Sequence, residues 1–412
     1  MIAMLLPDPP RGWLRWLRQA RQRAPAMLTG SVAWLCTVLA ILLTGSIAGC
    51  GGGVGTEGTG TFAGSVGSGP ITGFGSILVS GVRYEHSAAT IDDEDGNPVD
   101  RASLALGMVV QVDAQAIRTA AGGDAMSATA THVRIRRALL GPASAIDAAA
   151  GHLQVLAQQV LVTGDTVFSA ELAGGLSTLS EGQLLEVHGL YDASRTAWMA
   201  TRIALAAAGS TFRVTGPVAS VDPGQGFTLG SQRYVAASRD LVAGAVVQLQ
   251  VQPVPDAEGR WVVSALRTLA VPADERQHVS LEAMVASVLS SSRFIVDGTT
   301  VDTRTALVIG SVQPGALVQV HGSLQDGVLL ASRVEASTSG QVRGFELRGK
   351  LSQLDTASRR FVLHGLTVSY AGASFDGGSA ATLVGYTGTL EVKGRLSADR
   401  QVLEAISISF KN

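Results

Sequence analysis

An acidic loop, residues 91–98, holds the densest group of side chains that could bind a metal ion. Four consecutive carboxylates, residues 92–95, stand before Gly96. Hard cations such as Ca²⁺ prefer carboxylate oxygens. The EF-hand template requires an oxygen ligand four residues before Asp95, and Ile91 occupies that place. We therefore predict a surface turn built on Asp-Gly and no metal site.

The seven histidines are the other possible metal ligands. None forms a His-x-His or His-x-x-x-His pair. His188 and His321 occupy equivalent places in the internal repeats described below, and another copy has Lys393 there. A position that accepts lysine is expected to face solvent, so we predict that these histidines hold no metal. We also predict no cofactor.

Trp198 and Trp261 are repeat-equivalent as well. If they were exposed, they would form a platform on which sugar rings stack, which makes them the weak ligand-binding candidates of this sequence. The alternative, which we favour, is that each tryptophan caps the core of a β-module.

Catalytic motifs give no positive signal. The sequence has no Gly-x-Ser-x-Gly elbow for a serine nucleophile and no Walker A loop for a nucleotide. We predict that the protein is not an enzyme. A hydrolase whose two carboxylates meet only in the fold remains the minor alternative.

The elements that must position these residues repeat five times. Each copy has apolar residues at its first, third and eighth positions, and a small or turn-prone residue midway. This pattern predicts a tight hairpin, with turns near Gly81, Gly298 and Gly365. The five copies are residues 77–84, 153–160, 227–234, 294–301 and 361–368.

Further strands surround each hairpin. An opening strand precedes it, a Gly-x-x-x-x-Val-x-Gly strand follows it, and an Ala-Ser/Thr-Arg-Val/Ile strand closes the unit. Alternation of apolar and polar residues predicts half-buried strands. About five strands in about 60–75 residues suit a small barrel better than an immunoglobulin sandwich.

The predicted fold is all-β, with about five tandem OB-like barrels of roughly five strands each. The sequence resembles, over roughly residues 71–410, a domain family of unknown function built from repeated OB-like β-modules in proteobacterial lipoproteins. The resemblance rests on the motifs above and implies no catalytic residues. The expected modules are residues 71–137, 138–207, 210–271, 278–338 and 341–412.

The sequence of residues 1–49 is typical of a leader peptide and predicts that the protein is exported. Five arginines precede an apolar run that is too short to span a membrane well. Ile47, Ala48, Gly49 and Cys50 then resemble the lipobox that lipoprotein signal peptidase recognises. The resemblance implies cleavage before Cys50 and lipid attachment to that residue. The alternative is an ordinary signal peptide with a chance cysteine.

A glycine-rich segment, residues 50–70, follows the lipobox, and we predict that it is a flexible tether. The second residue after cleavage is Gly51 and not aspartate, a pattern that favours the outer membrane, facing the periplasm. The expected location is therefore the cell envelope, and the first expected partner is the membrane, through the lipid on Cys50.

Composition limits the other partners. Without the five arginines and one aspartate of the leader, the 31 basic and 33 acidic residues leave a net charge near −6. This excess of acid argues against nucleic acid, whose phosphates need many cations. We expect a non-enzymatic binding or scaffolding protein, whose ligand is an envelope protein or an oligosaccharide. The alternative is an accessory subunit of an envelope protein complex.

Overall fold

The computed structural model describes residues 64–119, 125–222, 224, 226–236, 241–269, 276–337 and 344–411. Within these ranges the regular structure is β-strand apart from four 3-10 helices of three or four residues. The prediction of an all-β fold is confirmed. No helix in the described ranges is long and apolar enough to cross a membrane.

Barrels 1 and 2 occupy the N-terminal half of the described chain. Barrel 1 contains β1 (Ser65–Phe74), β2 (Ile77–Val79), β3 (Val82–Glu85), β4 (Thr90–Asp92), η1 (Arg101–Ser103), β5 (Val109–Ala114), β6 (Arg118–Thr119) and β7 (Met126–Ile135). Barrel 2 contains β8 (Leu139–Asp147), β9 (His152–Val155), β10 (Gln158–Phe168), η2 (Ala170–Leu172), η3 (Gly175–Thr178), β11 (Leu184–Asp192) and β12 (Ala197–Leu205).

Barrels 3 to 5 follow in chain order. Barrel 3 contains β13 (Phe212–Asp222), β14 (Gly226–Leu229), β15 (Gln232–Val235), β16 (Val246–Val251) and β17 (Trp261–Thr268). Barrel 4 contains β18 (Arg276–Ser290), β19 (Arg293–Val296), β20 (Thr299–Asp302), β21 (Leu307–Ile309), β22 (Leu317–Gln325) and β23 (Val328–Ser337). Barrel 5 contains β24 (Phe345–Gly349), β25 (Ser352–Asp355), β26 (Arg360–Leu363), β27 (Leu366–Ser369), β28 (Ser374–Asp376), η4 (Ala380–Leu383), β29 (Thr389–Leu396) and β30 (Val402–Lys411).

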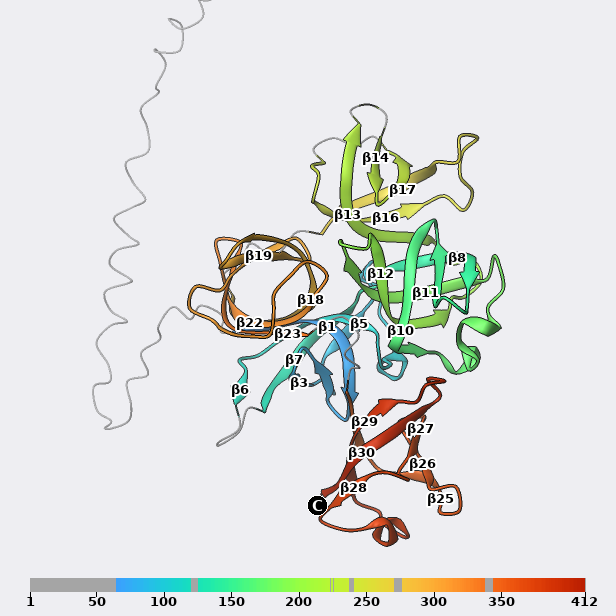
Figure 1. Ribbon diagram of the computed structural model, residues 1–412, viewed down its shortest axis with the longest axis vertical. Coiled ribbons are helices and arrows are strands. Elements are labelled where there is room, and N and C mark those ends of the chain that lie inside the picture. Colours follow the sequence, from blue (N-terminus) through green and yellow to red (C-terminus); the bar gives the residue numbers. More distant parts are fainter. Residues whose placement is uncertain are drawn as a thin grey trace, which may run out of the picture. The chain divides into compact units, whose positions relative to one another are not determined.

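All five barrels share one order of strand pairing. In barrel 1, β1 pairs with β2, β2 with β3, β3 in parallel with β7, β7 with β5, and β5 with β1 again. Barrel 4 repeats this circuit through β18, β19, β20, β23 and β22, which Figure 1 shows as a closed ring. Five strands in this closed order form the OB-type barrel that the sequence predicted.

The predicted hairpins are two-residue turns. Ser80 and Gly81 both have positive φ, at 47° and 75°, and the next strand begins at Val82. Asp297 and Gly298 repeat this geometry with φ of 44° and 75°. Positive φ at both turn positions is the type I′ arrangement, whose twist matches that of paired strands. Glycine at the second position therefore explains the centre of the repeated pattern in barrels 1, 4 and 5, whereas barrel 2 has Ala157 there with a φ of 60°.

The final glycine of the Gly-x-x-x-x-Val-x-Gly strand lies at a β-bulge. The strand register shifts immediately before Gly189, Gly322 and Gly394. A Cβ on Gly322 would lie 2.2 Å from the backbone oxygen of Leu330 on the paired strand. Close backbone approach at a bulge therefore explains this second repeated glycine.

Inward-facing Val, Leu, Ile and Phe side chains fill the barrels, as the alternation predicted. The apolar cores of barrels 1 and 5 form one continuous cluster, and those of barrels 2 and 3 form a second. Barrel 4 has a core of its own. The barrels are therefore not independent units along a string.

Strand pairing also joins separate barrels. The first half of β1 lies parallel to β18 of barrel 4, with Ser65 opposite His278 and Ser68 opposite Leu281. The end of β1 lies parallel to β24 of barrel 5. Strands β8 and β13 join barrels 2 and 3. Strand β1 thus pairs with elements of three barrels, including its own (Figure 1).

The predicted tether, residues 50–70, was wrong at its C-terminal end. Ser65 to Pro70 belong to β1 and pair with β5 along their whole length. Their glycines reflect crowding and not flexibility. A Cβ on Gly67 would lie 2.4 Å from the Tyr84 hydroxyl oxygen, and one on Gly69 would lie 3.0 Å from Cβ of Glu282 in barrel 4. The remainder of the predicted tether lies outside the described residues.

Candidate functional site: a cavity between four barrels

The acidic loop of barrel 1 is part of an ion-pair network and not a simple surface turn. Asp93 accepts hydrogen bonds from the backbone of Asp95 and Asn97, and Gly96 has a φ of 84°, which confirms the Asp-Gly turn. Glu94, however, is only 2% exposed. The prediction of a surface location was wrong for this residue, because neighbouring barrels cover it.

Arginines from other parts of the chain surround the loop. Arg213 of β13 lies 3.0 Å from Glu94 and forms a bidentate pair with Asp95. Arg137, between barrels 1 and 2, lies 2.7 Å from Glu94 and also 2.7 Å from Glu186 of barrel 2. Burial raises the pKa of Glu94 above its ordinary value, although both guanidinium groups favour the ionised form. The network therefore connects barrels 1, 2 and 3.

His188 continues the network. Its Nε2 lies 2.9 Å from Glu186, so this nitrogen carries a hydrogen that it donates to the carboxylate. Its Nδ1 lies 3.2 Å from the backbone nitrogen of Val109 in barrel 1. Burial opposes the ionisation of Glu186, but the hydrogen bond from His188 and the charges of His188 and Arg137 outweigh it and lower the pKa of Glu186 to about 2.

The expectation that His188 faces solvent was wrong, because its exposure is 0%. The equivalent Lys393 of barrel 5 has a side chain that is 59% exposed. Residue equivalence predicts the direction of a side chain relative to its own barrel, but another barrel covers the outer face of barrel 2. Within the described ranges, no cluster of three or more His, Cys, Asp or Glu is arranged to hold a metal.

The two tryptophans are buried. Trp198 and Trp261 are 7% and 8% exposed and pack in the shared core of barrels 2 and 3. Trp198 packs edge-on against Tyr191, with ring centroids 5.3 Å apart. The alternative of an exposed stacking platform is therefore wrong, and both residues cap barrel cores, as we favoured. Cys50 and the lipobox residues Ile47, Ala48 and Gly49 lie outside the described residues.

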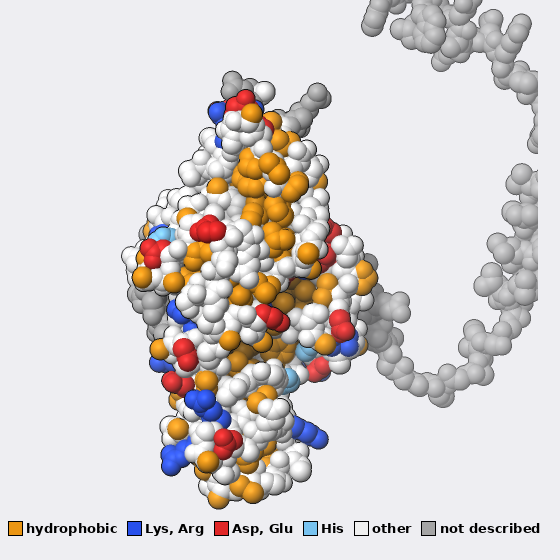
Figure 2. All heavy atoms as spheres, turned by 90° about the vertical axis from the view of Figure 1, so that its right-hand side faces the viewer, with side chains coloured by type: hydrophobic (Ala, Val, Ile, Leu, Met, Phe, Trp, Pro, Cys, Tyr) orange, Lys and Arg blue, Asp and Glu red, His pale blue; other side chains and the backbone are white. Residues whose placement is uncertain are grey.

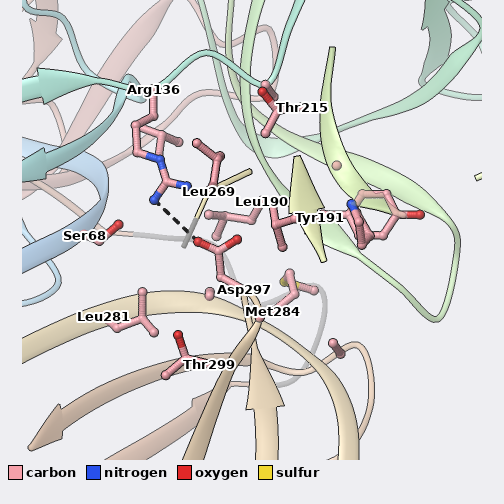
Figure 3. Close-up of a pocket in the computed structure, with 18 of the residues that line it drawn as sticks. Ser68, Arg136, Leu190, Tyr191, Thr215, Leu269, Leu281, Met284, Asp297 and Thr299 are labelled. Atoms are coloured by element: carbon pink, nitrogen blue, oxygen red, sulfur yellow. Dashed lines mark hydrogen bonds and ion pairs between the residues drawn. The ribbon is translucent and has the colours of Figure 1, made fainter. Parts of the chain in front are cut away.

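A cavity of about 850 Å³ lies where barrels 1 to 4 meet. Its volume is within the range of small-molecule sites, roughly 300–1,000 Å³. Strand β1 contributes Val66 and Ser68, and the other barrels contribute mainly apolar side chains. Figure 3 shows Leu190, Leu269, Leu281 and Met284 gathered around this space; they come from barrels 2, 3 and 4.

The apolar wall also joins the barrels. Val109, Leu190 and Met284 form a buried cluster that belongs to none of the three barrel cores. These residues point away from the interiors of barrels 1, 2 and 4 and meet one another. The cavity therefore depends on how the outer faces of separate repeats pack together.

Charged groups of the lining are paired with unequal strength. Arg137 is held by the buried acids described above, and Arg267 donates to the side-chain oxygen of Gln248 at 2.7 Å. Arg136 and Asp297 face each other across 3.5 Å (Figure 3). Their side chains are 25% and 38% exposed, so this is the most loosely held of these pairs.

Sequence reasoning missed Arg136, Asp297 and the apolar wall. The lining comes from four repeats that are far apart in sequence, so no local motif marks it. One signal was present. Met284 stands where barrels 1, 2 and 3 have Pro70, Pro142 and Pro217, and an apolar side chain at an outward position indicates a contact outside its own barrel.

Three of these barrels match one family model. The matched segments, residues 64–119, 141–204 and 282–335, lie in barrels 1, 2 and 4, and the family is described as "Domain of unknown function (DUF5666)". Three segments of the chain are therefore similar to this family. The resemblance to a family of repeated, uncharacterised β-modules is thereby confirmed. Barrels 3 and 5 have the strand order of the three matched barrels, and no curated protein matches the chain in sequence.

Proposed function

We propose that this protein is an exported lipoprotein of the bacterial cell envelope, anchored through Cys50, which binds a ligand without catalysing a reaction. The observation that carries the proposal is the cavity of about 850 Å³ between four barrels. Concave, mainly apolar sites with a few polar groups are the usual form of a ligand-binding pocket.

The lining favours binding over catalysis. Among its carboxylates, Glu94 is committed to Arg137 and Arg213, and Asp297 faces the Arg136 guanidinium group at 3.5 Å. A general acid or base needs a carboxyl group that is free to exchange a proton with a substrate. The ion-pair network instead fixes the walls that a ligand would contact.

The anchor would keep the cavity near a membrane. Fourteen residues separate Cys50 from Ser65, where β1 begins. Fully extended, this segment spans at most about 50 Å. Because Val66 and Ser68 line the cavity, the site lies at the start of the first barrel after the anchor.

The anchor is tested with labelled palmitate in the bacterial host. We expect the full-length protein to carry the label and to fractionate with the outer membrane. The Cys50→Ser variant should lose both properties. If Cys50→Ser still carries palmitate, the lipid assignment is wrong.

Ligand binding is tested by photo-crosslinking in the host, with a photoreactive amino acid at Ala286, which lines the cavity. Ala219 is the matched control, because it is the repeat-equivalent residue of barrel 3 and does not line the cavity. The proposal predicts an adduct of defined mass at Ala286 and none at Ala219. If neither position gives an adduct, the binding function is contradicted.

A role as accessory subunit of an envelope complex is the second candidate, and exposed apolar surface favours it. Figure 2 shows hydrophobic side chains gathered in a band on one face. In barrel 4, the three consecutive residues of β21, Leu307, Val308 and Ile309, are 56%, 42% and 44% exposed. Patches of this kind commonly mark protein contacts. A photoreactive residue at Leu307 that repeatedly captures one envelope protein would favour this role.

A further inference from the structure

The chemistry of the lining restricts the class of ligand. On the basis of the proposed binding function, we propose that the cavity takes an anionic amphipath, which is a molecule with an aliphatic chain and a carboxylate or phosphate head. The aliphatic chain lies among the apolar side chains of barrels 2 to 4, and the head pairs with Arg136.

The apolar part of the lining fits an acyl chain. Leu190, Leu281 and Met284 are each less than 10% exposed in the described structure, and together with Leu269 they surround the space between the barrels (Figure 3). Aliphatic side chains and the unbranched methionine adapt to a flexible hydrocarbon chain. Burial of the CH₂ groups of such a chain removes apolar surface from water and so favours binding.

A sugar ring fits the lining poorly. The aromatic residues among the described lining are Tyr191 and Trp198, and they pack edge-on against each other. Trp198 is also buried in the core of barrel 2. The faces that would stack on a sugar are thus already used in packing.

Arg136 is the natural partner for an anionic head. Arginines outnumber carboxylates in the lining, at four (residues 134, 136, 137 and 267) against three (residues 94, 282 and 297). Arg137 is committed to two buried acids. In the described structure the Arg136 guanidinium group pairs with the half-exposed Asp297 at 3.5 Å, and Figure 3 shows both side chains pointing into the cavity.

A ligand carboxylate or phosphate would take the place of Asp297 on the guanidinium group. A solvent-exposed ion pair stabilises a protein little, so its exchange costs little. A guanidinium group can bind a carboxylate or phosphate through two parallel hydrogen bonds. Ser68 and Thr299 add hydroxyl groups to the same cavity lining.

Two sources supply an aliphatic chain, but only the first also has an anionic head, because an acyl chain bound to the anchor has no free carboxylate. One is a lipid of the envelope, either a free fatty acid or a phospholipid. The other is the acyl chain on Cys50 of the same molecule, because the anchor lies within about 50 Å of the cavity along the chain. Comparison of the acylated protein with the Cys50→Ser variant separates these sources.

The experiment titrates the full-length Cys50→Ser protein with the fluorescent fatty acid cis-parinaric acid and then displaces the probe with palmitate or with neutral hexadecanol. Ala286→Trp should narrow the cavity and weaken probe binding, whereas Ala219→Trp should bind as the parent does. Arg136→Gln should weaken palmitate binding by about tenfold or more, with less than about threefold effect on hexadecanol. Asp297→Asn should strengthen palmitate binding, because it frees Arg136.

The outcomes separate this inference from the binding function. Equal probe binding by Ala286→Trp and Ala219→Trp, with both folded by circular dichroism, would overturn it. So would equal losses for palmitate and hexadecanol in Arg136→Gln. If the probe does not bind but photo-crosslinking at Ala286 captures another molecule, the amphipath is wrong and the binding function stands.

The acylated protein then identifies the source. If the Cys50→Ser variant binds the probe and the acylated protein does not, the anchor lipid of the same chain occupies the cavity. If both bind equally, the ligand is an envelope lipid. The second result supports the anionic amphipath, whereas the first contradicts it, because the acyl chain of the anchor has no anionic head.

Discussion

Single glycines in β1 decide how closely the barrels approach. Gly67 lies opposite Val112 of its own barrel and Ser280 of barrel 4, and the ring of Tyr84 passes beneath it. Tyr84 is fully buried, and its ring cannot move without disturbing the core. Gly73 has the same role toward barrel 5, because a Cβ there would lie 2.3 Å from the backbone oxygen of Glu346.

Gly67→Ala should therefore destabilise the protein by about 1–3 kcal/mol, since the added methyl group would overlap the Tyr84 ring. Gly344→Ala is the control, because its Cβ would meet nothing within 4 Å. Urea unfolding of both variants checks this. Equal stability of the two variants would show that β1 has room for a side chain.

Arg213 is the buried cation on which the acidic loop depends. Arg213→Met should cost about 3–5 kcal/mol, because it leaves Glu94 with one cation fewer in a water-excluded site. Arg233→Met removes a pair with Asp222 in which both side chains are more than 40% exposed, and should cost less than about 1 kcal/mol. A similar loss in both variants in thermal unfolding would contradict this ranking.

Glu186 makes stability depend on pH. Its pKa is lowered to about 2, so its ionised form stabilises the fold fully above the ordinary value of 4.5. That contribution, about 3 kcal/mol, is lost as the pH falls from 4.5 to about 2. Glu186→Gln should therefore be less stable than the parent at pH 7 and should approach the parent below pH 3. Parallel pH profiles of the unfolding free energy would exclude this role.

At the scale of the elements, most of the fold was predictable because each barrel repeats the same local rules. Positive φ favours glycine in the hairpin turns of barrels 1, 4 and 5, and alternation selects the buried face of each strand. The start of β1 was not predictable, because glycines that admit a neighbouring backbone read as a flexible linker. The burial of His188 was not predictable either, since it depends on another barrel.

The β-bulge at Gly322, in strand β22 of barrel 4, gives a test at this scale. Gly322→Ala should cost about 1–3 kcal/mol, because its Cβ would overlap the Leu330 carbonyl across the sheet. Ala114 and Val251 occupy the position of Gly322 in barrels 1 and 3. The need for glycine at this bulge is therefore limited to barrels 2, 4 and 5. Gly372→Ala, whose Cβ would meet nothing within 4 Å, is the control. Thermal unfolding compares the two, and a smaller loss for Gly322→Ala would contradict this explanation.

At the scale of the whole molecule, the candidate site exists because the barrels join. Barrel 4 pairs with β1, and Leu281 and Met284 of its first strand reach the cavity from that junction. The sequence cannot predict which residues of four repeats line the cavity together, because the repeat pattern describes each barrel by itself. The function proposed here therefore depends on the pairing of β1 with β18.

Hydrogen exchange of the individual backbone amides of β1 in the full-length protein tests that pairing most directly. Ser65 to Ser68 pair with β5 on one side and with β18 on the other. We expect all of their amides to exchange as slowly as those of the barrel cores. If alternate amides of this segment exchange as fast as those of exposed turns, barrel 4 does not pair with β1, and the cavity between the barrels does not persist in solution.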